Sequence, residues 1–134
     1  RTVTVCRHGF CHAPDFQLAV RMFLDAGGPA RRAAFVLFAV VVAPIAEEAT
    51  FRGVLLPLLV RRLGPAWGVA LVGVGFAALH ADLGTACALA AFSVALSLAY
   101  ARTGTLLVPI AMHALFNGAN LLLLLGLVRA GWAN

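Results

Sequence analysis

The chain has 134 residues, enough for one domain, and 63% of them are hydrophobic, whereas soluble domains contain about 45–50%. Only 11% are charged, and the net charge of +5 reflects ten basic residues, all of them arginine. Most of these arginines lie at the ends of apolar runs, where side chains of membrane helices reach the lipid headgroups. The composition excludes a soluble globular domain and predicts an integral membrane protein. No basic face is interleaved with aromatic residues, so nucleic acid is not expected as a partner.

Residues 1–14 are polar and show no regular pattern, so we expect an irregular tail. Four of its side chains could bind a metal such as zinc: Cys6, His8, Cys11 and His12. Their spacing matches no standard zinc pattern, and we favour a tail in which these residues are incidental. The odd number of cysteines in the chain indicates no disulfide framework.

Residues 15–26 predict an amphipathic helix, because apolar residues recur on one face and polar residues on the other. A Gly-Gly-Pro sequence at 27–29 ends it. The helix is too short to span a bilayer, so we expect it to lie in the membrane interface. Residues 1–32 are therefore interpreted as an N-terminal tail with an interfacial helix.

Four apolar runs follow, and each predicts a membrane helix: 32–61, 66–80, 85–100 and 106–128. The predicted fold class is all-α, a polytopic transmembrane helical bundle of about four membrane helices preceded by the amphipathic helix. The run 66–80 is short for a bilayer, which needs about 20 residues, so we expect it to tilt or to enter without crossing. Residues 33–128 form the predicted intramembrane core, and 129–134 a C-terminal tail.

The segment Glu47-Glu48-Ala49-Thr50-Phe51-Arg52 places three ionisable residues in the middle of the first apolar run. A charged side chain at the centre of a membrane helix costs about 2.5–3.5 kcal/mol on insertion scales, so these residues indicate a functional site. Glu48 and Arg52 are four residues apart with the acid first, which favours an ion pair along the helix. Pro44 and Pro57 predict a bend on each side of the segment.

The other helices carry few polar residues. His80 ends the second run, four residues after Phe76, and His113 and Asn117 share one face of the last run. Because polar groups cannot stay unpaired in lipid, we expect these faces to meet the first motif inside the bundle. We interpret three further residues as contacts that hold helices together: Ser93, Ser97 and Asn120.

These residues suit hydrolysis. Glu47 beside the imidazole of His80 can act as a general base on a water molecule. His113 and Asn117 can donate hydrogen bonds to a developing oxyanion. No serine or cysteine has an adjacent base in the sequence, so water is the expected nucleophile and an amide the expected substrate. The predicted catalytic residues are Glu47, Glu48, His80, His113 and Asn117, with Arg52 as the structural partner of an ion pair.

A metal mechanism stays open as an alternative. Glu47, His80 and His113 form a set of two histidines and one carboxylate, which holds zinc in some hydrolases, and that zinc would activate the water. The His-Glu-x-x-His pattern of helical zinc proteases is missing. The preferred interpretation therefore requires no cofactor, with zinc as the alternative.

Three motifs occur in order, each on its own apolar helix: Glu-Glu-x-x-x-Arg at 47–52, Phe-x-x-x-His at 76–80 and His-x-x-x-Asn at 113–117. Together they resemble the CAAX-protease and bacteriocin-processing family of intramembrane endopeptidases, also called CPBP or Abi. The resemblance covers about residues 33–125. It implies an all-helical fold that encloses a site open to the membrane.

By this resemblance, Glu47 corresponds to the water-activating glutamate and His80 to its partner. His113 and Asn117 correspond to the oxyanion-stabilising pair, and Arg52 to a structural residue. The family's mechanism has been described as glutamate-dependent and as metal-dependent. Eukaryotic members remove the last three residues of prenylated CAAX proteins, and some bacterial members are linked to bacteriocin immunity or peptide maturation. The implied partners are membrane lipid and a peptide or lipidated protein, in a prokaryotic cell membrane.

Two functions from different classes are compatible with these motifs. The first is an intramembrane endopeptidase that cleaves a membrane-associated protein or peptide, including prenylated CAAX-type substrates. The second is a non-catalytic membrane protein that binds or regulates a partner, as in bacteriocin immunity. The presence of all four of Glu47, His80, His113 and Asn117 favours the endopeptidase, because a scaffold has no need of all four. A transporter is a weaker third option, suggested only by the two prolines.

Overall fold

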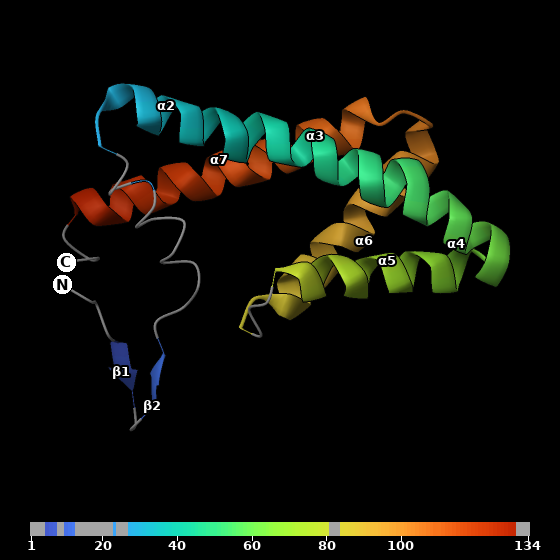
Figure 1. Cartoon of the computed structure of the whole chain (residues 1–134). Coiled ribbons are helices and arrows are strands. Elements are labelled where there is room, and N and C mark those ends of the chain that lie inside the picture. The colour runs from blue at the N-terminus through green and yellow to red at the C-terminus, as the bar shows by residue number, and fades with distance from the viewer. Residues whose placement is uncertain (1–4, 8–9, 13–22, 24–26, 81–83, 131–134) are drawn as a thin grey trace.

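The computed structural model describes residues 5–7, 10–12, 23, 27–80 and 84–130. Helices account for nearly all of this part of the chain, which confirms the all-α prediction for the membrane core (Figure 1). The elements run as β1 (Val5–Arg7), β2 (Phe10–His12), α2 (Pro29–Leu37), η1 (Phe38–Val42), α3 (Ala43–Glu48), η2 (Ala49–Leu55), α4 (Leu56–Leu63), α5 (Pro65–Leu79), α6 (Ala86–Thr103) and α7 (Leu107–Arg129).

The N-terminal tail departs from the expectation of an irregular segment. Its strands β1 and β2 pair antiparallel, with Cys6 opposite Cys11 in the register. The side chains considered as metal ligands in this tail lie outside the described part of the structure. The amphipathic helix expected over 15–26 also lies outside the described residues, except for Phe23, which is helical.

The segments from α2 to α4 form one continuous helix, Pro29–Leu63, of 35 residues. It contains two π-helical stretches, η1 and η2, each directly before a proline that lies near the start of the next α-helical stretch. Proline has no N–H and its ring clashes with the carbonyl four residues earlier. For Pro44 and Pro57 those carbonyls belong to Val40 and Gly53, inside η1 and η2. The widened turns therefore accommodate the prolines at the positions where bends were predicted.

Gly64, at φ 83°, ends α4 and allows α5 to turn back against it. The two helices approach closely at Gly68, where an added Cβ would lie 2.7 Å from Val60 Cγ2. A second left-handed glycine, Gly104, ends α6, after which α7 runs back along α6, η1 and α3. A buried apolar cluster lies between the long helix and α5 and contains Phe51, Leu56, Val72 and Phe76.

Within the described residues, three helices are long and apolar enough to cross a membrane: Pro29–Leu63, Ala86–Thr103 and Leu107–Leu127. The helix α5 has only 15 residues, or roughly 22 Å, which is less than a hydrocarbon core of about 30 Å. This confirms that the second apolar run is short for a bilayer, and whether it tilts or enters without crossing stays a prediction. Because α5 runs back from Gly64 along the long helix, its C-terminal end reaches about the level of the glutamate motif.

Candidate active site

The buried ion pair of Glu48 and Arg52 lies at the centre of the site. Arg52 Nη1 donates to Glu48 Oε1 at 2.9 Å, and both side chains are fully buried. The four-residue spacing places them one turn apart, as predicted from the sequence. Arg52 Nη2 reaches across to α6, where it donates to the carbonyl oxygen of Ser93 at 2.7 Å and to its hydroxyl at 2.6 Å. The pair is thus held between two helices.

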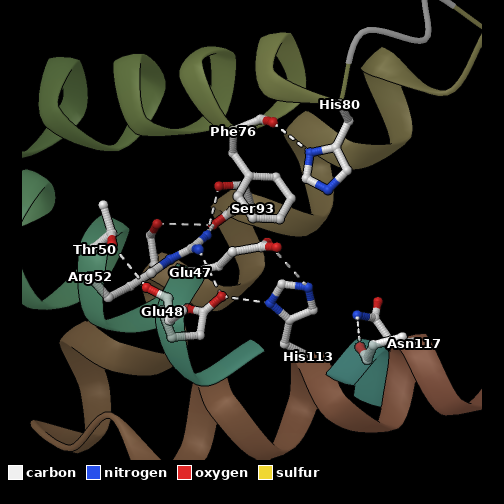
Figure 2. Close-up of polar contacts among 12 residues, drawn as sticks. Glu47, Glu48, Thr50, Arg52, Phe76, His80, Ser93, His113 and Asn117 are labelled. Atoms are coloured by element: carbon white, nitrogen blue, oxygen red, sulfur yellow. Dashed lines mark hydrogen bonds and ion pairs between the residues drawn. The ribbon is translucent and has the colours of Figure 1, made fainter. Parts of the chain in front are cut away.

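His113, on α7, binds the same carboxylate. Its Nδ1 lies 2.8 Å from Glu48 Oε1, and its ring is almost fully buried (Figure 2). An ionised carboxylate can only accept a hydrogen bond, so Nδ1 carries the hydrogen. The opposite ring nitrogen, Nε2, then faces Glu47, with 3.8 Å between Nε2 and Glu47 Oε2. Glu48 therefore fixes the orientation of the ring that faces Glu47.

Glu47 differs from Glu48 in its surroundings. Its side chain is 32% exposed, whereas Glu48 is completely buried. Its Oε2 is a buried atom without a hydrogen-bond partner in the described structure, and the closest ion-pair nitrogen is His113 Nε2. The distance of 3.8 Å is too long for a direct hydrogen bond, and one water molecule could contact both atoms. The two adjacent glutamates thus have different environments, one partly exposed and one completely buried.

His80 lies at the end of α5. Its Nδ1 donates to the carbonyl oxygen of Phe76 at 2.8 Å, which leaves Nε2 outside that bond. The ring of Phe76 lies between the two histidines, with centroid distances of 4.7 Å to His80 and 5.6 Å to His113. No hydrogen bond between His80 and Glu47 occurs in the described residues, and His113 is the imidazole paired with the glutamates. The predicted partnership of His80 with Glu47 stays a prediction.

Asn117 lies one turn after His113 on α7. Its Nδ2 donates to the carbonyl oxygen of Ala39 at 2.9 Å, so the side chain links α7 to η1. An amide NH₂ group has two hydrogens, and this bond uses one of them. The oxyanion role of Asn117 stays a prediction.

A scan against protein-family models matches residues 29–119 to the type II CAAX prenyl endopeptidase Rce1-like family. The match covers more than half of the chain and contains all three motifs. The chain belongs to the Rce1-like family. Comparisons with curated proteins and with solved structures gave no match. Membership agrees with the apolar helices, and the protein is an integral membrane protein of a CAAX prenyl endopeptidase family.

The metal alternative for this Rce1-like protein requires three ligands close together. Among the described residues, no group of three or more His, Cys, Asp or Glu side chains is placed to hold a metal ion. Of the three candidate ligands Glu47, His80 and His113, only Glu47 and His113 contact each other as an ion pair. The donor set does not fit a zinc centre in this conformation, so we derive no catalytic step through a metal.

Ser93, Ser97 and Asn120 were interpreted from the sequence as contacts between helices. The structure shows such a contact for the first of them and hydrogen bonds within one helix for the other two. Ser93 joins α6 to η2 through Arg52. Ser97 instead donates to the carbonyl oxygen of Ser93 on its own helix, and Asn120 is exposed and donates to Phe116 on its own helix. The sequence contained no signal that distinguishes Ser93, because its partner is 41 residues away.

Proposed function

We propose that this protein is an intramembrane endopeptidase that hydrolyses a peptide bond of a prenylated, CAAX-type protein or peptide with a water molecule activated by Glu47. The observation that carries the proposal is the position of Glu47 Oε2, which makes no hydrogen bond in the described structure and lies 3.8 Å from His113 Nε2. Family membership supports the reaction class. An integral membrane protein of this family is expected in a prokaryotic cell membrane.

In the proposed reaction, Glu47 removes a proton from the water as its oxygen attacks the carbonyl carbon. The carbonyl becomes an oxyanion, and the proton on Glu47 passes to the leaving amine nitrogen when the C–N bond breaks. The carboxylate is thereby regenerated, so neither a cofactor nor a covalent intermediate is needed. His80 lies near the same level of the membrane, where it would assist the glutamate as its partner.

His113 and Asn117 are the proposed oxyanion donors. For His113 this role requires a hydrogen on Nε2 as well as on Nδ1. Its Nδ1 lies 2.8 Å from Glu48 Oε1, so Nε2 is the ring nitrogen that faces the reacting groups. Donors fixed by buried contacts need no reorganisation during the reaction, and one such donor typically contributes about 10²–10³ to the rate.

The depth of the site supports a lipidated substrate. Glu47 is about equally far from the arginines at the two ends of the long helix, Arg32 and Arg61. At 1.5 Å per residue, Glu47 is roughly 20 Å along the helix from each of these arginines, which supports a site deep in the hydrocarbon region. A prenyl chain inserts into the hydrocarbon region and would bring the attached peptide toward this depth.

The protein purified in detergent should cleave an internally quenched peptide that carries a farnesylated cysteine followed by three residues. Mass spectrometry of the products should show cleavage directly after the modified cysteine. The same peptide without the farnesyl group serves as the control and should react much more slowly. Failure of the wild-type protein to cleave either peptide would contradict the proposal, and equal cleavage of both would contradict the prenylated substrate class.

Chelators should leave this activity unchanged, because the proposed water is activated by a carboxylate. The measurement is the initial rate after incubation with EDTA and with 1,10-phenanthroline. A loss of activity that added Zn²⁺ restores would favour the zinc alternative, with Glu47, His80 and His113 as ligands in a conformation that brings them together.

A further inference from the structure

Ser93 is fully buried on α6 and faces the glutamate motif. Its hydroxyl and its carbonyl oxygen both accept from one atom, Arg52 Nη2, at 2.6 and 2.7 Å (Figure 2). Hydrogen bonds to a charged donor are stronger than neutral ones. Arg52 Nε has no partner in the described structure, so Nη1 and Nη2 alone fix the guanidinium plane through hydrogen bonds.

The contacts of Arg52 continue toward the reacting groups. Nη1 holds Glu48 Oε1, which in turn holds His113 Nδ1, while Glu48 Oε2 has no hydrogen-bond partner in the described structure. Both hydrogen bonds of the Glu48 carboxylate are therefore made by Oε1, and these two bonds set the orientation of the carboxylate. A rotation of the guanidinium would move that oxygen, and His113 Nε2 would move with it, away from its position opposite Glu47.

We propose that Ser93 is a positioning residue, which sets the orientation of His113 through Arg52 and Glu48. The expected effect of Ser93 on the cleavage rate rests on the proposed function. Its expected effect on the orientation of His113 rests on the hydrogen bonds alone. It goes beyond the three motifs, because Ser93 belongs to none of them and comes from a helix that supplies no predicted catalytic residue.

Ser97 provides a matched control. It lies one turn after Ser93 on the same helix, is equally buried, and its hydroxyl donates only to the carbonyl oxygen of Ser93 at 2.9 Å. Replacement of either serine by alanine removes one buried hydroxyl from the same region of α6. Only Ser93→Ala removes a hydrogen bond of Arg52, so a difference between the two variants reports on positioning rather than on packing.

In the farnesyl-peptide assay, Ser93→Ala should lower kcat about tenfold with KM unchanged, because the carbonyl oxygen still holds Nη2 and only one charged hydrogen bond is lost. Ser97→Ala should stay within about twofold of the wild type. Ser93→Thr, which keeps the hydroxyl, should recover most of the lost rate. Equal losses in the two alanine variants, or no loss in Ser93→Ala, would overturn the kinetic part of the proposal.

A second measurement does not depend on activity. The imidazole ¹⁵N and ¹H resonances of His113, assigned by their loss in His113→Gln, report on the bond from Nδ1 to Glu48 in detergent micelles. They should shift or broaden in Ser93→Ala and stay unchanged in Ser97→Ala. Unchanged resonances in Ser93→Ala would overturn the positioning role. If the wild type cleaves no peptide, the proposed function fails, and the resonances still decide whether Ser93 positions His113.

Discussion

Replacing Glu47 by glutamine is expected to lower the rate of peptide cleavage by about 10²–10⁴-fold, the usual contribution of a general base. Glutamine keeps the size of the side chain, but its amide cannot accept the proton of the attacking water. The buried Oε2 of Glu47 makes no hydrogen bond in the described structure, and its contact with His113 Nε2 is long, at 3.8 Å. The midpoint of thermal unfolding should therefore stay close to that of the wild type.

Thr50→Ala is the control for this substitution. Thr50 lies on the same long helix, is exposed, and its hydroxyl donates only to the carbonyl oxygen of Ala46 at 2.8 Å. Its rate should match the wild type in the farnesyl-peptide assay. A Glu47→Gln variant that retains full activity would contradict the role of Glu47 as the base, because no other carboxylate in the described site is partly exposed beside His113.

The parts of the site that follow from local spacing were predictable from the sequence. Glu48 and Arg52 meet because four residues make about one helical turn, and Gly64 and Gly104 end helices because they adopt a left-handed backbone. The short α5 was also expected, since its length is a property of the chain. These features depend on neighbours within a few residues, which the sequence displays directly.

Features that depend on how helices rotate against one another were not predictable. His113 pairs with Glu48 through Nδ1 and faces Glu47 with Nε2, and the sequence does not display which ring nitrogen meets which glutamate. The widened turns of η1 and η2 rotate the later residues of the long helix about its axis. A regular period of 3.6 residues therefore does not predict which glutamate faces which neighbouring helix. The link from Arg52 to Ser93 was missed for the same reason.

Replacing Arg52 by leucine is expected to destabilise the protein by about 3–5 kcal/mol, the usual cost of removing one partner of a buried ion pair. Glu48 would remain fully buried, with Oε2 unpaired and Oε1 bonded only to His113. The hydroxyl and carbonyl of Ser93 would lose their charged donor at the same time. The midpoint of unfolding in an SDS titration from detergent micelles measures this loss.

The double variant Glu48→Gln with Arg52→Leu tests whether the loss arises from an uncompensated charge. A neutral amide at position 48 can still accept from His113 Nδ1, and no buried carboxylate is then left without its cation. The double variant should therefore unfold at a higher SDS concentration than Arg52→Leu alone, while its cleavage rate stays low because His113 has lost its anionic partner. A double variant less stable than Arg52→Leu would show that lost packing around the arginine stem, rather than the buried charge of Glu48, accounts for the destabilisation.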